Sequence, residues 1–344
     1  MTTLDHRPVA TRRGTPLDCD SKRNGRALIV SLDGTSNQFG EYNTNVVEIY
    51  HRIVKSERQR TYYNSGIGTY IAPASPWDRA VQFFYHNSNL VFAWDLKKHV
   101  LAAYRWLSEN YQPGDRIYFF GFSRGAFQVR VLAGMIEKVG LLLPGNEEQI
   151  EFAYDLYKDL NSDPDNTQFY NMAARFKETF SHPGVHVYFV GVWDTVSSVG
   201  LFRNKQFPLT DTSEHICYFR HALALDERRV KFLPEYARGG SSYAESAGLD
   251  SAGLRPRPPR VKEVWFSGSH SDINTELSNG AVSAVWMGNE AITAGLDLKP
   301  SKVLWDWKSL REDMPTKSLG SVWWLAEFLP MNFLAYTGIR KTYW

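Results

Sequence analysis

The chain of 344 residues can hold one large α/β domain or two ordinary ones, and its 43 % hydrophobic and 22 % charged content is typical of globular proteins. A formal net charge of +2 gives no electrostatic reason to expect nucleic acid or an anionic membrane as a partner. No run of about 18 apolar residues occurs that could span a bilayer as a helix. The composition therefore argues against nucleic-acid-binding and transmembrane proteins.

The N-terminal part of the sequence differs in character from the rest of the chain. Residues 1–26 mix basic and acidic side chains and contain no apolar core like that of a signal peptide. We interpret 1–26 as a mobile polar tail and 27–344 as a single domain. The two cysteines, Cys19 and Cys217, do not make a disulfide framework, so they are compatible with a reducing compartment and favour a cytoplasmic location.

Strand patterns and helix patterns alternate after the tail. Helical spacing of apolar side chains predicts one helix from Asn45, one over 90–111 that Pro113 ends, and one after Ser123. Short apolar runs predict strands at 27–32, 60–65, 117–120, 185–192 and 261–266. This alternation predicts an α/β fold with a mostly parallel sheet and helices on both faces.

Three segments interrupt the alternation. Residues 143–182 carry helical patterns without an evident strand and are interpreted as a helical cap over the sheet edge. Residues 239–260 are rich in Gly, Ser and Pro, which is typical of a long irregular insertion. The C-terminal region, 302–344, is aromatic, and its rings either cover the core or contact a lipid interface; they include Trp305, Trp307, Trp323, Trp324, Phe328 and Phe333.

The sequence Gly121-Phe122-Ser123-Arg124-Gly125 lies between a predicted strand and a predicted helix. This is the context of a nucleophile elbow, a sharp turn that lifts a serine oxygen above the edge of an α/β-hydrolase sheet. Gly121 and Gly125 leave room for the crowded turn. We therefore predict Ser123 as a nucleophile, the other interpretation being a structural glycine turn.

A serine hydroxyl needs a histidine to take its proton and an acid to orient that histidine. Asp194 closely follows the 185–192 strand and is predicted as the acid, although it could instead cap the next segment. His270 follows the 261–266 strand and is predicted as the base. Other candidates fit less well: Asp226 and Asp272 are reserve acids, while His215 and His221 do not follow a predicted strand.

An oxyanion hole usually takes one N–H from the residue after the nucleophile and one from a loop after an earlier strand. Arg124 supplies the first, and Gly34 or Thr35, after the 27–32 strand, the second. The same Asp33-Gly34-Thr35 also suggests a haloacid-dehalogenase-type phosphatase. Ser31 stands where that mechanism needs its nucleophilic aspartate, so we reject it.

Five blocks occur in an order that resembles a known family: Leu32-Asp33-Gly34-Thr35, Gly66-Ile67-Gly68-Thr69, Gly121–Ala126, Val192–Val196 and Ser269-His270-Ser271-Asp272. The sequence is similar over roughly 27–300 to the α/β-hydrolase family that includes the catalytic domains of type VI secretion phospholipase effectors. This resemblance implies Ser123, Asp194 and His270 as the catalytic triad. One departure is that Asn274-Thr275-Glu276 stands where the family usually has a glycine cluster.

These features together predict a serine hydrolase that cleaves carboxylic esters through an acyl-enzyme on Ser123. The resemblance implies phospholipid or other lipid acyl esters as substrates. Peripheral membrane contact is the second interpretation of the aromatic C-terminal region. The mechanism requires no metal and no organic cofactor. The alternative, motivated by the altered loop after His270, is a catalytically silent hydrolase fold that serves as a binding module.

Overall fold

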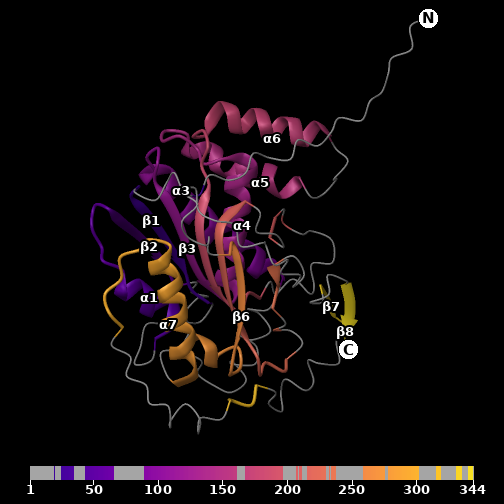
Figure 1. Ribbon diagram of the computed structural model, residues 1–344. Helices are drawn as coiled ribbons and strands as arrows, with labels where there is room; N and C mark the ends of the chain where they lie inside the picture. The colour runs from indigo at the N-terminus through magenta and orange to yellow at the C-terminus, as the bar shows by residue number, and fades with distance from the viewer. Residues whose placement is uncertain are drawn as a thin grey trace, which may run out of the picture.

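The computed structural model describes most of the chain (Figure 1). The residues described are 19, 25–34, 43–65, 89–160, 167–196, 207, 209–210, 215–229, 232, 234–237, 259–275, 278–301, 315–318, 331–334 and 340–343. Thr35, Gly66–Thr69, the predicted insertion up to residue 258, Trp305, Trp307, Trp323, Trp324 and Phe328 lie outside them.

A six-stranded parallel sheet forms the centre of the molecule, in the order β2-β1-β3-β4-β5-β6. Its strands are β1 (Ala27–Leu32), β2 (Gln59–Asn64), β3 (Arg116–Phe122), β4 (Val187–Trp193), β5 (Ile216–Ala224) and β6 (Val261–Phe266). Since all six strands run in one direction, the segments that follow them emerge at the same edge of the sheet. The predicted α/β fold with a mostly parallel sheet is confirmed.

Both faces of the sheet are buried, as the near-continuous apolar strands predict. Alternate side chains of β3 point to opposite faces, so Ile117 and Phe119 join one hydrophobic cluster while Tyr118 and Phe120 join the other. The first cluster also contains apolar residues of α3 (Asn89–Asn110), α4 (Arg124–Val139), α5 (Ile150–Asp159) and α6 (Thr167–Phe180).

The second face is covered by α1 (Asn45–Arg52) and α7 (Ser278–Thr293), which lie side by side in Figure 1. Thr44 caps α1 by accepting the N–H of Val47 at 3.2 Å. Two 3-10 turns, Glu147–Gln149 and Asp272–Asn274, and a separate antiparallel hairpin of β7 (Met331–Leu334) and β8 (Arg340–Tyr343) complete the described elements. No helix among the described residues is both long and apolar enough to cross a bilayer.

The region 143–182 forms α5 and α6, as its helical pattern predicts, and both helices pack against α4 on one face of the sheet (Figure 1). The ends of the region are held beside the last turn of α4. Leu143 N–H donates to Phe180 O at 2.8 Å, and Ser181 Oγ donates to Val139 O at 2.9 Å. Since α4 begins at Arg124 and ends at Val139, this anchor lies far from Ser123.

The expectation that the two cysteines are not part of a disulfide is wrong, because Cys19 and Cys217 form one with their Cα atoms 5.8 Å apart. A sequence separation of 198 residues hides the pairing, and Cys217 lies in β5, which the apolar pattern does not reveal as a strand. A disulfide is typical of oxidising compartments, so the cysteines no longer favour a reducing one. The end of the predicted tail is also fixed, since Arg26 forms an ion pair with Asp115 at 2.6 Å.

Candidate active site

Ser123 occupies the turn between β3 and α4, with φ 55° and ψ −120°. This conformation is rare for a residue with a side chain and is the strained turn expected of a nucleophile elbow. The turn is tied to the end of β4, because Ser123 N–H donates to Trp193 O at 3.0 Å and Val196 N–H donates to Ser123 O at 3.3 Å.

The two glycines of the motif are required by close approach of backbone. A Cβ on Gly121 would lie 2.7 Å from Gly125 O, and one on Gly125 would lie 2.2 Å from Leu32 O. Neither distance is tolerated by real side chains. Glycine at 121 therefore lets the first turn of α4 lie against the end of β3, and glycine at 125 lets that turn lie against the end of β1.

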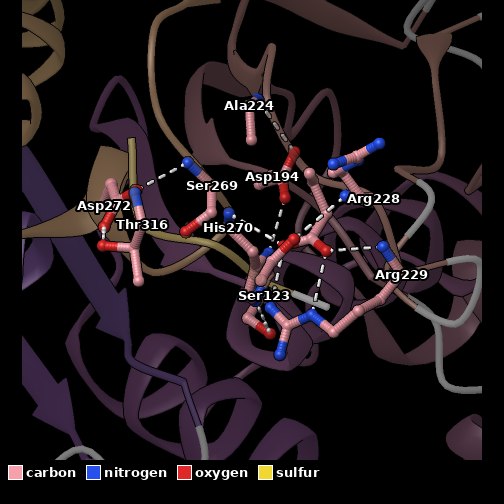
Figure 2. A network of polar contacts seen from close by, with 11 residues as sticks. Ser123, Asp194, Ala224, Arg228, Arg229, Ser269, His270, Asp272 and Thr316 are labelled. Carbon is pink, nitrogen blue, oxygen red and sulfur yellow. Dashed lines mark hydrogen bonds and ion pairs between the residues drawn. The ribbon is translucent and has the colours of Figure 1, made fainter. Parts of the chain in front are cut away.

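Ser123, His270 and Asp194, from three different strand ends, meet in one hydrogen-bonded chain (Figure 2). His270 Nδ1 lies 2.5 Å from Asp194 Oδ2, and His270 Nε2 lies 2.9 Å from Ser123 Oγ. An ionised carboxylate can only accept, so Nδ1 carries the proton, and a neutral ring then accepts the Ser123 hydroxyl at Nε2. The arrangement is that of a nucleophile, a base and an orienting acid.

Asp194 is completely buried and has a positive φ of 41°. Its N–H donates to Ala222 O at 2.8 Å, and its Oδ1 accepts the N–H of Ala224 at 3.1 Å. The acid is therefore held by the neighbouring strand β5 through backbone groups. The carboxyl oxygen Oδ2 remains directed at His270.

A second buried histidine supports the residue after the acid. Thr195 N–H donates to His221 Nε2 at 3.1 Å, and His221 Nδ1 lies 2.9 Å from Glu263 Oε1. Because Nε2 accepts, Nδ1 must carry the proton and donate it to the carboxylate. Glu263 Oε1 also accepts the N–H of Ala237 at 2.9 Å. Sequence reasoning set His221 aside because it does not follow a predicted strand.

Two aromatic rings flank the imidazole of His270. The ring centroids of Phe122 and Phe232 lie 4.7 Å and 4.9 Å from it, the second in an edge arrangement. The guanidinium of Arg229 lies 3.8 Å from the Phe232 centroid. The imidazole is thus confined on two sides by apolar surface.

Three carboxylates accept backbone N–H groups of the loop that carries His270, residues 267–275, and one of them, Asp272, belongs to the loop itself. Asp226 Oδ2 accepts the N–H of Gly268 at 2.7 Å, and Asp272 Oδ2 accepts the N–H of Ser269 at 2.8 Å. Glu227 Oε2 accepts the N–H of His270 at 3.1 Å. The reserve acids Asp226 and Asp272 therefore hold the loop backbone, and Asp194 is the carboxylate at His270 Nδ1.

The charges of two of these carboxylates are stabilised by their donors. Burial would raise the pKa of Glu227, but hydrogen bonds from Arg229 and His270, with the charge of Arg229, outweigh it and lower the pKa. Burial likewise would raise the pKa of Asp272, and hydrogen bonds from Ser269 and Thr316 lower it instead. Both side chains are therefore ionised acceptors at neutral pH.

The predicted oxyanion donors lie around the elbow. Arg124 begins α4, and burial lowers the pKa of its guanidinium to about 10, with Asp95 acting in the opposite direction. Gly34 directly follows Asp33 at the end of β1, and its N–H already donates to Asp33 Oδ1 at 2.7 Å. Thr35, the other candidate for the second N–H, lies outside the described residues.

Asp33 is 1 % exposed and is surrounded by donors. Besides the Gly34 N–H, it accepts the hydroxyls of Thr44 at 2.5 Å and Tyr63 at 3.2 Å. Burial, followed by the charge and hydrogen bond of Asp33, raises the pKa of Tyr63. Asp33 therefore joins the ends of β1 and β2 to the start of α1, while Ser31 is buried inside β1.

A serine at a strained turn after a central strand of a parallel sheet, with its histidine and acid after later strands, defines an α/β-hydrolase-like protein. Residues 26–290 match the family model described as the catalytic domain of type VI secretion (T6SS) phospholipase effectors of the Tle1-like kind. The chain belongs to this family, and the resemblance noted in the sequence is confirmed.

Similar proteins include the uncharacterized protein YEL023C of Saccharomyces cerevisiae, which is 42 % identical over 279 residues. The match covers 73 % of this chain but 41 % of the yeast protein, so the chain spans about two fifths of that relative. Two solved structures are more distant. An uncharacterized protein from Pseudomonas aeruginosa has 18 % identity and a TM-score of 0.40, covering 85 % of this chain and 49 % of that one. The Tle1 effector bound to the VgrG spike of the type 6 secretion system has 16 % identity and a TM-score of 0.34, and the match covers 73 % of this chain and 51 % of that one.

Proposed function

We propose that this protein is a serine hydrolase that cleaves carboxylic esters, with lipid acyl esters, phospholipids among them, as its substrate class. The observation that carries the proposal is the unbroken hydrogen-bonded chain from Ser123 Oγ through the imidazole of His270 to Asp194. Membership of a phospholipase catalytic-domain family supports the lipid substrate and an esterase or lipase activity.

The proposed first half-reaction forms an acyl-enzyme. Ser123 Oγ attacks the acyl carbon while its proton passes to His270 Nε2, and the carbonyl oxygen becomes an oxyanion. The donors proposed for that charge are the N–H of Arg124 and one N–H of Gly34 or Thr35. The Gly34 N–H already donates to Asp33 Oδ1. Collapse expels the alcohol, which takes the proton from Nε2.

The second half-reaction releases the acid. Water attacks the acyl carbon while Nε2 of His270 accepts its proton, and the proton then returns to Ser123 Oγ as the ester bond to the serine breaks. Asp194 remains ionised throughout and stabilises the imidazolium that forms in each half-reaction. No redox step and no additional reactant other than water is needed.

The proposal is tested with a fluorophosphonate, which phosphonylates activated serines, read by intact mass. We expect the wild type to gain one phosphonyl group and Ser123→Ala to gain none. Ser31→Ala is a matched control. Ser31 lies in β1 and pairs with Phe120 of β3, the strand that precedes Ser123, but it is buried and outside the hydrogen-bonded chain. It should label like the wild type.

Turnover of a lipid ester separates an enzyme from a catalytically silent fold. The wild type should release a burst of product from an activated ester, and Ser123→Ala should show no burst. A phospholipid hydrolysis rate that rises once the phospholipid concentration is high enough to form vesicles would support the lipid substrate class. Labelling that persists in Ser123→Ala, or a wild type that is never labelled, would contradict the proposal.

A further inference from the structure

A short C-terminal segment reaches the active site from beyond the family-matched region, which ends at residue 290. Within this segment, residues 315–318, Thr316 contacts Asp272 twice: its N–H donates to Oδ2 at 2.9 Å and its hydroxyl donates to Oδ1 at 2.7 Å (Figure 2). Ser318 Oγ accepts the N–H of Arg228 at 3.1 Å. The segment therefore touches two different loops.

Both of these loops hold the base. Asp272 Oδ2 accepts the N–H of Ser269, the residue before His270. Arg228 is preceded by Glu227, which accepts the N–H of His270 itself. The segment is therefore connected to the backbone around His270 by two short routes. One passes through the Asp272 carboxylate to the N–H of Ser269, and the other passes from the N–H of Arg228 through the adjacent Glu227 carboxylate to the N–H of His270.

The base needs such external support more than its partners do. Ser123 and the Asp194 turn follow central strands, and backbone hydrogen bonds join them to each other and to β5. His270 follows β6, which ends the order of the sheet and has intermediate or exposed side chains throughout. A misplacement of about 1 Å at a reacting group can lower a rate by about 100-fold, so the hold on this loop matters for chemistry.

We propose that residues 315–318 form a strap that positions the imidazole of His270 against Ser123. Thr316 acts through Asp272, and Ser318 acts through the loop of Glu227. This inference rests on the proposed function, because it assigns the strap to the same hydrolytic site. Thr316 is a positioning residue, so its loss should slow the chemical step and leave ester binding unchanged.

The test compares three full-length variants with the wild type. Thr316→Val keeps the shape and removes the hydroxyl, Thr316→Ser keeps the hydroxyl, and Thr316→Val with Ser318→Ala removes both side-chain contacts. Thr293→Val is a matched control, because Thr293 is an exposed threonine whose hydroxyl donates to a backbone oxygen, Asn289 O, at the end of α7. The readouts are the rate of fluorophosphonate labelling of Ser123, and kcat and KM for a short soluble ester.

Thr316→Val should label about three- to tenfold more slowly, the range expected for one typical hydrogen bond. Its kcat should fall by a similar factor with KM unchanged. The double variant should fall further, while Thr316→Ser and Thr293→Val should match the wild type. The double variant labelling at the wild-type rate would overturn the strap while leaving the proposed function intact. Absence of labelling at Ser123 in the wild type would instead overturn the proposed function.

Discussion

Among single residues, buried polar side chains carry much of the site's organisation. His221 and Glu263 are almost completely buried, and each is bound by backbone N–H groups as well as by the other. A buried polar group that loses its partner keeps the whole cost of leaving water. These two residues therefore join the segment after Asp194 to β5 and β6 through hydrogen bonds that are costly to break.

His221→Phe should destabilise the fold, because it leaves the Thr195 N–H and the Glu263 carboxylate without their ring partner. We expect the free energy of unfolding to fall by about 1–3 kcal/mol for each unsatisfied group. His221→Gln, which can both accept and donate, should recover part of the loss. Urea unfolding of the three proteins measures this effect. Equal midpoints for the wild type and His221→Phe would show that the pair contributes nothing.

At the level of elements, apolar patterns predict most of the sheet but miss β5. Arg220 and His221 interrupt its apolar run, yet both are buried because they pair with Glu290 and Glu263. Those carboxylates come from α7 and β6, so no local pattern can reveal the pairing. The helix α7 is missed for a different reason, because its first turn contains Ser278, Asn279 and Gly280, which are poor helix formers.

The hydrogen-bonded chain at Ser123 could be predicted from the sequence because each member follows a predicted strand, and parallel strands end at one edge. The hydrogen bonds that hold the neighbouring loops could not be predicted, because they join segments distant in sequence. Asp226 and Asp272 were foreseen only as alternative acids. The strap contacts at Thr316 and Ser318 have no sequence signal that we can identify.

The contact between Thr316 and Asp272 should show a defined pH dependence in stability. Because the pKa of Asp272 is lowered in the folded protein, its contribution is complete above the ordinary aspartate value of about 4 and is lost as pH falls through the lower, folded value. Thr316→Val should therefore be less stable than the wild type from about pH 5 to about pH 8, and the difference should shrink below about pH 4.

Thermal unfolding of both proteins across this pH range measures that difference, with Thr293→Val as the reference for losing an exposed threonine hydroxyl. A difference that grows as the pH falls below about 4 would contradict the assignment of Asp272 as an ionised acceptor for Thr316. A constant difference at every pH would also contradict it, because the charge of Asp272 would then make no contribution.

For the whole molecule, the disulfide joins the segment before β1 to β5, which lies three positions from β1 in the sheet order. It links residues 198 positions apart, and the loop that it closes contains Ser123 and Asp194. A covalent link across so long a loop restricts the unfolded chain much more than the folded one. The disulfide should therefore stabilise the domain that carries the site.

We expect Cys19→Ser combined with Cys217→Ala to lower the free energy of unfolding by about 2–5 kcal/mol. Adding a reductant to the wild type should lower its Tm to about that of the double variant. The Tm of the double variant should not change with the reductant. Differential scanning fluorimetry with and without reductant measures both effects. If the Tm of the wild type does not change in a reductant that is shown to cleave the disulfide, the disulfide has no stabilising role.

The backbone hydrogen bonds between the Ser123 turn and the end of β4 have a wider consequence. They join Ser123 and the turn of Asp194 in one hydrogen-bonded unit, whereas His270 lies on a separate loop after β6. Under the proposed function, a displacement of that loop alone would change reactivity while the central strands keep their positions.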